Sequence, residues 1–500
     1  MPVSTTTRMT PAQLWLLFVA CASASVVVAA MAALNTALVD IAVDTGATQS
    51  QLTWIVDGYT LTLAALLLPA GALGDRFGRR GVLVAGLIIF GLASALPLVV
   101  ATPLWLIISR AVAGVGAALV MPATLAIITA GFPEERRAHA VGIWAGFVGS
   151  GGIAGLLVSG LILSYGSWTL IFVGFAASSA VMVIAALTVA SSREYERTRP
   201  DVRGAVLSIA AVGLVVFGVI EAPHRGWTDP IVLASLAGGV AAAAGFVAAE
   251  LRTAAPMLDV RLFGNRAFGS GAAALLLQFL AVFGVFFVLI QYLQLVLGYS
   301  PFRSALALTP LGVAVLLLSV LVPRVSHRIG LRALTAAGLA GIGIALVWIG
   351  SLGEGLSYWQ VIGPLLVAGV GLGLCTAPST HAIVANTPAD KQGVASAVND
   401  ATREIGAAIG VALAGSVLAA AYSQRIAPVA SALPEPVRGA VAGSLASAVQ
   451  VADAAGPRGA ELVTVARQAF LDGMQQASWT LAAVVLVGAI ILLWWAPGRD

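Results

Sequence analysis

The sequence predicts an all-α integral membrane protein with fourteen spanning helices, arranged as two six-helix halves and two additional helices between them. Apolar residues make up 59% of the 500 residues and charged residues only 10%, and the mean hydropathy is +0.99. A soluble domain this poor in charge would lack solvating groups on its surface. Many runs reach the roughly 20 apolar residues that a spanning helix needs, and one short charged segment occurs twice along the chain.

The apolar runs give the helices in order. We expect spanning helices at 14–42, 51–73, 81–100, 103–130, 139–163, 168–190, 204–221, 230–251, 268–297, 303–323, 331–351, 358–384, 394–422 and 476–496. An even number of crossings places both termini on the same side of the membrane.

The distribution of basic residues predicts which side that is. With the N-terminus in the cytosol, the cytosolic segments carry 18 of the 26 basic residues and the outer loops carry six. Four of those six lie in one long loop, to which the positive-inside rule gives little weight. Both termini are therefore expected in the cytosol.

Two long connections predict the domain organisation. The charged link 191–203 follows six helices and separates an N-terminal half, 1–190, from a linker with the two additional helices, 191–267. The C-terminal half, 268–500, contains an outer loop at 423–475. This loop keeps a helical periodicity, which favours amphipathic helices over the outer face; the alternative is a disordered tether.

The repeated charged segment indicates an internal repeat. VSHRIGLR, which ends at Arg332, echoes LGDRFGRR, which ends at Arg80, with Arg and Gly residues in register. Two similar halves are a common plan for transporters. The first copy predicts a tight cytosolic turn that switches conformation, in which Asp75 meets the N-terminal end of the helix at 394–422. Its candidate residues are Gly71, Gly74, Asp75, Arg76, Gly78, Arg79 and Arg80.

A few charges fall inside the predicted helices. Such a charge costs at least about 2.5–3.5 kcal/mol at the bilayer centre, so each is a functional candidate. We assign them to proton coupling: Asp40, Asp57, Arg110, Asp400, Arg403 and Glu404. Asp57 and Arg110 lie at similar depths, and a structural pair between them is the alternative to a role of Arg110 in proton transfer. Asp40 is nearer the outer edge, where a hydrated interfacial role is the alternative.

Asp400, Arg403 and Glu404 lie on one face of a predicted helix, because they are three or four residues apart. Burial and a like-charged neighbour favour the neutral form of a carboxyl, as a proton carrier requires, while an adjacent arginine opposes this. A locked ion-pair cluster that holds helices together is the alternative.

Several segments, in order, resemble the fourteen-helix drug:proton antiporters of the major facilitator superfamily, the group that includes QacA-type exporters. They are WIVDGYTLTLAALL from Trp54, RAVAGVGAALVMPATL from Arg110, PMLDVRLF from Pro256, QYLQLVLGYSP from Gln291 and SAVNDATREIGAAIGVALAGS from Ser396. The resemblance implies that Arg110 takes part in proton transfer. It also implies proton-coupled export of hydrophobic or cationic drugs across the cytoplasmic membrane of a bacterium.

Two positions depart from that family's pattern. Asn35 stands where the first helix usually carries an aspartate, with Asp40 five residues later, and Leu156 follows Gly155 where a proline is usual. A rotation of about 140° separates positions five residues apart, so Asp40 does not replace the missing aspartate on the same face.

The sequence shows no phosphate-binding loop, metal-ligand cluster, nucleophile constellation or basic nucleic-acid patch. We therefore expect no enzymatic activity and no cofactor, with the proton motive force as the energy source and the protein acting as a monomer. The partners expected are a small-molecule substrate, protons and the lipid bilayer.

The substrate cannot be named from the residues. Candidate cavity residues are Asn35, Trp54, Trp144, Phe286 and Tyr292, since aromatic rings attract cations. The alternatives are interfacial anchoring of these aromatics and export of one endogenous metabolite, such as a lipid, siderophore or self-made antibiotic. A channel or a membrane enzyme is the alternative outside transport.

Overall fold

The computed structural model describes residues 9–190, 201–253, 256, 258–354, 357–387 and 392–498. These residues form helices and connecting loops, without a strand among them. Thirteen of their helices are long and apolar enough to cross a membrane. The 29-residue helix α3 runs alongside them, so the expected count of fourteen is consistent with the fold.

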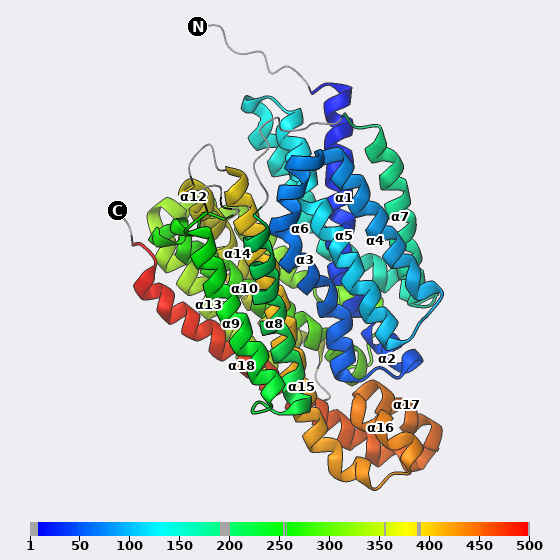
Figure 1. Ribbon diagram of the computed structural model, residues 1–500. Coiled ribbons are helices and arrows are strands. Elements are labelled where there is room, and N and C mark those ends of the chain that lie inside the picture. The colour runs from blue at the N-terminus through cyan, green and yellow to red at the C-terminus, as the bar shows by residue number, and fades with distance from the viewer. Residues whose placement is uncertain are drawn as a thin grey trace, which may run out of the picture.

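Six long helices form an N-terminal bundle (Figure 1). They are α1 (Pro11–Ala33), α3 (Gln49–Phe77), α4 (Arg79–Ala95), α5 (Pro103–Gly131), α6 (Glu134–Tyr165) and α7 (Thr169–Leu187). A short helix α2 (Leu38–Thr45) connects α1 to α3 at one end of this bundle. The predicted first helix, 14–42, is therefore interrupted between α1 and α2.

A C-terminal bundle repeats this arrangement. It contains α10 (Arg266–Gln291), α11 (Pro301–Ala307) with α12 (Thr309–Ile329), α13 (Leu331–Gly350), α14 (Tyr358–Ala385), α15 (Gln392–Ser431) and α18 (Ala460–Trp495).

Equivalent close contacts in the two bundles confirm the internal repeat. In the N-terminal bundle Gly86 of α4 and Gly116 of α5 pack backbone to backbone: a Cβ at Gly116 would lie 2.6 Å from the Gly86 carbonyl oxygen. In the C-terminal bundle Gly338 of α13 and Gly371 of α14 do the same, with 2.6 Å from a Cβ at Gly338 to the Gly371 carbonyl oxygen. Small residues allow helix axes to approach closely in this way.

The two additional helices, α8 (Val202–Arg225) and α9 (Pro230–Glu250), pair with each other, and α8 covers the seam between the bundles. The ring of Trp54 on α3 lies 6.1 Å from that of Phe217 on α8. On the other side of the seam, Ser416 Oγ of α15 donates to the Val219 carbonyl oxygen at 2.8 Å. Because α8 contacts both bundles, it closes this side of their interface. Residues 191–200 of the predicted link 191–203 lie outside the described residues, and α8 begins within the link, at Val202.

The predicted outer loop is helical, and the disordered-tether alternative is wrong. The helix α15 continues to Ser431, α16 (Glu435–Gly443) and α17 (Leu445–Ala455) follow, and α18 begins at Ala460. Figure 1 shows α16 and α17 beyond the bundles, at the end opposite the start of α1 and the end of α18. We refer to this end, which also holds α2, as the far end.

Candidate functional site: buried charges between the two bundles

A wholly buried arginine lies inside the N-terminal bundle. Arg110 of α5 is 2% exposed. Its Nε donates to the Ile55 carbonyl oxygen at 3.3 Å and its Nη2 to the Ala30 carbonyl oxygen at 2.9 Å. The guanidinium carbon lies 4.2 Å from the centroid of the Tyr59 ring. Backbone oxygens and an aromatic face thus surround this cation.

Asp57 does not pair with Arg110, although the sequence leaves such a pair open. The residues of α3 that contact Arg110 are Ile55 and Tyr59, each two positions from Asp57. Two residues rotate a helix by about 200°, which places Asp57 on the opposite face of α3. The side chains of Asp57 and Arg110 lie at similar depths along their helices but point in different directions.

Asp57 lies instead on the face of α3 that packs against α15. One turn before it, Thr53 contacts Gly415 of α15. Trp54 and Leu61 pack on a cluster that includes Ala408 and Ala412 of α15. Asp57 is 0% exposed, and neither carboxyl oxygen has a hydrogen-bond partner among the described residues. An ionised carboxylate so placed is strongly disfavoured.

The three charged residues of α15 stay together, as predicted. Arg403 Nη1 lies 4.0 Å from Asp400 Oδ1, and the Arg403 guanidinium lies 4.6 Å from the centroid of the Phe279 ring of α10. Glu404 follows one turn after Asp400, and its Oε2 is buried without a hydrogen-bond partner in the described structure. The contact of 4.0 Å between Arg403 and Asp400 is at the limit of an ion pair, and the alternative of a locked ion-pair cluster stays a prediction.

A polar chain that the sequence did not reveal reaches Asp400 from α14. Thr380 Oγ1 donates to Asn399 Oδ1 at 3.0 Å, and Asn399 Nδ2 donates to Asp400 Oδ1 at 3.3 Å. Tyr59, Phe279, Asn399 and Thr380 are therefore site residues that sequence reasoning missed. The only signal for Tyr59 and Asn399 was their place in the segments from Trp54 and Ser396; Phe279 and Thr380 gave none.

Asp40 does not join the central charges. It is half-buried on α2, outside the candidate membrane span that ends at Thr36. Burial and, secondarily, the nearby carboxyl of Asp44 raise the pKa of Asp40. Its geometry matches the interfacial alternative.

The predicted cavity residues do not line one space. Trp144 is buried within the N-terminal bundle, where its Nε1 donates to Thr124 Oγ1 at 3.2 Å. Tyr292 is also buried, and its hydroxyl donates to the Gly353 carbonyl oxygen at 2.9 Å.

The other predicted cavity residues lie elsewhere. The ring of Trp54 packs against α8. The ring of Phe286 lies 6.3 Å from that of Phe283, in a tilted contact on α10. Asn35 is buried, with its Nδ2 donating to the Ala32 carbonyl oxygen at 3.0 Å. Trp144 and Tyr292 are packed in the protein interior, and the predicted aromatic cavity stays a prediction.

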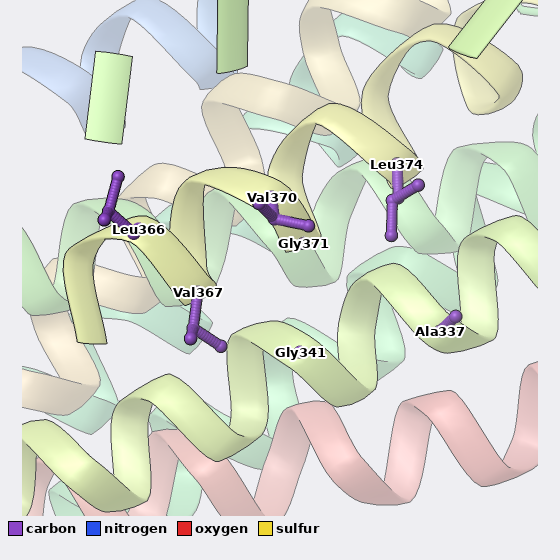
Figure 2. Close-up of a pocket in the computed structure, with 7 residues that line it drawn as sticks. All are labelled: Ala337, Gly341, Leu366, Val367, Val370, Gly371 and Leu374. Carbon is purple, nitrogen blue, oxygen red and sulfur yellow. The ribbon is translucent and has the colours of Figure 1, made fainter. Parts of the chain in front are cut away.

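A groove of about 260 Å³ lies between α13 and α14 (Figure 2). Its lining is apolar and contains none of the predicted site residues: Ala337, Gly341, Leu366, Val367, Val370, Gly371 and Leu374. Ala337, Leu366 and Val370 are exposed on the surface of the bundle. An apolar groove on a spanning surface suits contact with lipid chains.

The predicted switch turn is mostly helical. The helix α3 continues through Gly71 and Gly74 to Phe77, and the chain breaks at Gly78 alone, whose φ is +99°. Arg79 Nη1 then donates to the Ala126 carbonyl oxygen of α5 at 3.2 Å, and Arg80 Nη1 to the Val189 carbonyl oxygen after α7 at 3.2 Å. The predicted tight turn is thus one residue wide. The side chains of Asp75 and Arg76 lie outside the described part of the structure, as does the expected contact of Asp75.

The second copy of this segment has the same geometry. Gly330 separates α12 from α13 with φ +87°, and Arg332 Nε donates to the Ala496 carbonyl oxygen after α18 at 2.8 Å. Two six-helix bundles, each with a charged turn of the same geometry, and a carboxyl, Asp57, buried where they meet fit one family. Its model, described as Major Facilitator Superfamily, matches residues 20–411. The chain belongs to the Major Facilitator Superfamily.

Relatives within this superfamily cover most of the chain. It is 32% identical over 474 residues to the multidrug resistance protein Stp of Mycobacterium tuberculosis, covering 91% of this chain and 87% of that protein. It is 33% identical over 442 residues to the multidrug efflux pump LfrA of Mycolicibacterium smegmatis, with 88% and 87% covered. It is also 35% identical over 373 residues to a methylenomycin A resistance protein of Streptomyces coelicolor, with 74% and 78% covered.

Solved structures share the superfamily fold. A bacterial homologue of the human lysosomal transporter Spinster, in an inward-facing and unoccupied conformation, aligns with a TM-score of 0.68 at 16% identity, covering 99% of this chain and all of that one. The match supports the fold of this superfamily member and carries no information on its substrate.

Proposed function

We propose that the protein is a secondary active transporter that exports hydrophobic or cationic small molecules in exchange for protons. The observation that carries the proposal is Asp57, a wholly buried carboxyl without a hydrogen-bond partner in the described structure, on the face where one bundle packs against the other. The names of the relatives Stp and LfrA support drugs as the substrate class.

The position of Asp57 links its charge to the packing of the bundles. A neutral acid fits the closed contact between α3 and α15, whereas an ionised one would lose its hydration with no partner to replace it. Proton binding therefore favours the closed contact, and proton loss favours separation. A transporter changes its exposed side by shifting such an equilibrium.

The charges on α15 supply a site for exchange. Asp400 and Glu404 carry two carboxyl groups against one guanidinium, on Arg403, so the ionised trio has an excess of one negative charge. A proton and a cationic substrate both neutralise that excess, and the two compete for the same carboxyl oxygens. Binding of one releases the other, which gives antiport.

We further propose that the far end faces outward and that both termini are cytosolic, in the cytoplasmic membrane of a bacterium. The arginine distribution supports this orientation, and the relatives are bacterial. The transporter would work as a monomer, with the proton motive force in place of a cofactor.

Purified protein in proteoliposomes tests the proposal. Methyl viologen is a suitable cationic probe, because a relative is the methyl viologen resistance protein SmvA of Salmonella typhimurium, 32% identical over 451 residues. Adding the probe on one side of the membrane should release protons on that same side, and an imposed proton gradient should drive the probe uphill. Uphill transport that persists when an uncoupler has removed the gradient would exclude proton coupling.

Export of one specific metabolite is the second candidate. It is favoured by the similarity to the cephamycin export protein CmcT of Amycolatopsis lactamdurans, 33% identical over 422 residues, covering 83% of this chain and 87% of that protein. A panel of unrelated cations separates the two candidates, since a specific exporter should transport none of them.

A further inference from the structure

Arg403 of α15 lies against an aromatic ring and a carboxylate at the same time. Its guanidinium carbon is 4.6 Å from the centroid of the Phe279 ring of α10, and its Nη1 is 4.0 Å from Asp400 Oδ1. The face of a ring attracts an organic cation, and a carboxylate neutralises the charge of that cation. Arg403 therefore occupies a place where both kinds of ligand for an organic cation are present.

The contacts of Arg403 in this place are weak. A separation of 4.0 Å from Asp400 is too long for a hydrogen bond, and the Arg403 side chain is 28% exposed. Arg110, which also lies over a ring, differs in both respects. Two carbonyl oxygens accept hydrogen bonds from its guanidinium, at 3.3 and 2.9 Å, and it is 2% exposed. Arg403 can thus leave its ring by rotation of its own side chain.

The groups that Arg403 would leave behind are held in place by their surroundings. Gly406 of α15 packs directly against the backbone carbonyl group of Leu276 of α10, a close approach that small residues allow. Asn399 Nδ2 donates to Asp400 Oδ1 at 3.3 Å. The two helices that carry the ring and the carboxylate are therefore fixed against each other, and the site is ready for a second cation when Arg403 moves away.

Two further rings continue the site along α10. Phe283 stacks on Phe279 with 6.0 Å between the ring centroids and 20° between the ring planes, and Phe286 follows Phe283 at 6.3 Å. All three rings are half-buried. Phe283 packs against the buried clusters of both bundles, so this row of rings lies where the bundles meet. Such a row beside a carboxylate suits a flat aromatic cation that is longer than a guanidinium.

We propose that Arg403 is an intramolecular substitute for the substrate: a flat aromatic cation displaces its guanidinium from Phe279 and Asp400 and extends over Phe283. The inference rests on the proposed function, because it names the substrate class of the exchange site and the groups that bind it. When the substrate leaves, Arg403 returns, so neither the ring nor the carboxylate is left without a cation. Phe279 is then a specificity-determining residue, since its face attracts a cation more than a neutral molecule of the same shape.

A double-mutant cycle on the binding of methyl viologen tests this exchange. In the wild type the ring gains the probe and loses Arg403, so Phe279→Leu should change the dissociation constant by less than about threefold. Arg403→Gln removes the competing cation, so affinity for methyl viologen should rise about tenfold. In the Arg403→Gln background the ring attracts the probe without competition, and Phe279→Leu should now weaken binding about tenfold. Equilibrium dialysis of the purified protein, without a proton gradient, gives the constants.

Two further variants control for charge and for packing. Arg303→Gln removes an equal charge from another ring, because the guanidinium carbon of Arg303 lies 4.1 Å from the centroid of the Tyr299 ring, and it should leave the affinity unchanged. Phe279→Trp keeps a ring at the site. In the Arg403→Gln background it should bind methyl viologen at least as tightly as Phe279 does, because indole is the best aromatic partner of a cation. Melting temperatures show that each variant is folded.

Equal effects of Phe279→Leu in the two backgrounds would overturn the proposal, because Arg403 would then act on the probe through its charge alone. An affinity that Arg403→Gln leaves unchanged would overturn it as well. Neither result would affect proton-driven transport by the wild type, which the proteoliposome assay measures. Conversely, a non-additive cycle in a protein without proton-driven transport would refute the proton exchange and leave the displacement of Arg403 standing. A wild type that binds no methyl viologen would refute the cationic substrate class and this proposal together.

Discussion

Gly443 of α16 lies directly against Thr48, the residue that caps the start of α3. A Cβ added at Gly443 would be 3.6 Å from the Thr48 Cβ. The helices α16 and α17 belong by chain order to the C-terminal bundle, yet α17 packs on α2, and Leu445 and Ala448 share a buried cluster with Ile41. The two bundles are therefore joined at the far end through this contact.

Alternating access predicts that this contact opens in every transport cycle. In a background with Cys21 and Cys375 replaced by alanine, the pair Thr48→Cys and Gly443→Cys should form a disulfide, because bonded cysteines have Cβ atoms about 3.5–4.5 Å apart. Oxidation should stop methyl viologen transport in proteoliposomes, and reduction should restore it.

Two controls make this result specific. Each single cysteine variant should be insensitive to oxidant. The pair Gly218→Cys and Ser235→Cys, whose Cβ atoms would be 3.4 Å apart, links α8 to α9 and should leave transport intact when oxidised. Full activity of the oxidised Thr48–Gly443 pair would mean that α16 moves together with the N-terminal bundle.

Much of the fold could be predicted from the sequence because the membrane imposes a simple rule. A run of about 20 apolar residues must be helical in lipid, so composition alone places most helices. The boundary between α3 and α4 was misplaced, since Gly74 and Gly78 look alike in sequence. Only the backbone shows that the left-handed residue is Gly78.

The buried charges could be predicted as a set but not as pairs. Depth follows from counting residues, which placed Asp57 and Arg110 at one level. Direction depends on which neighbour each helix face meets, and Arg110 is bound by backbone carbonyl oxygens of Ala30 and Ile55. Because every residue has a backbone carbonyl group, the sequence does not show which carbonyl oxygens bind the arginine.

Gly78→Ala should slow transport of every substrate alike. Gly78 has φ +99°, which a residue with a Cβ adopts at a cost of about 1–3 kcal/mol. Gly74→Ala is the matched control in the same segment, because its Cβ would meet no atom within 4 Å inside a regular helix. Turnover and thermal stability are measured together. A Gly78→Ala variant with normal rates and altered substrate preference would contradict this role.

The orientation predicts where a membrane-impermeant thiol reagent reacts in intact cells. Ala454→Cys, on the exposed surface of α17, should be labelled from outside, whereas Ser444 is unsuitable because it is buried. Ala12→Cys, exposed at the start of α1, should react only after lysis. The reverse pattern would place the far end in the cytosol.

Asp40→Asn should stabilise the protein at neutral pH. Because the folded state raises the pKa of Asp40, its contribution to stability is fully present below the unfolded value, about 3.9, and is lost as pH rises through the folded value. An amide avoids this loss, so the gain should stay below about 1 kcal/mol for a half-buried group and vanish in acid. Asp44→Ala should instead destabilise at both pH values, since Asp44 Oδ2 accepts from Trp168 Nε1 at 2.8 Å. Melting curves at both pH values provide the measurement.

Replacing the Asp57 carboxyl by an amide should abolish proton coupling without destabilising the fold. Asp57→Asn keeps the size of a side chain that has no hydrogen-bond partner in the described structure, so its melting temperature should equal or exceed that of the wild type. An amide cannot cycle a proton, so proton-driven transport should fall to the level of empty liposomes while exchange of labelled methyl viologen continues.

The same assay ranks the other carboxyls. Asp400→Asn and Glu404→Gln, within the charged trio of α15, should impair proton-driven transport far more than Asp40→Asn, which lies on α2 outside the candidate spans. A side chain that only holds helices together would lower exchange and proton-driven transport equally, and would lower the melting temperature as well. If Asp57→Asn, Asp400→Asn and Glu404→Gln combined in one protein still move methyl viologen uphill and release protons, the coupling group is elsewhere in the chain.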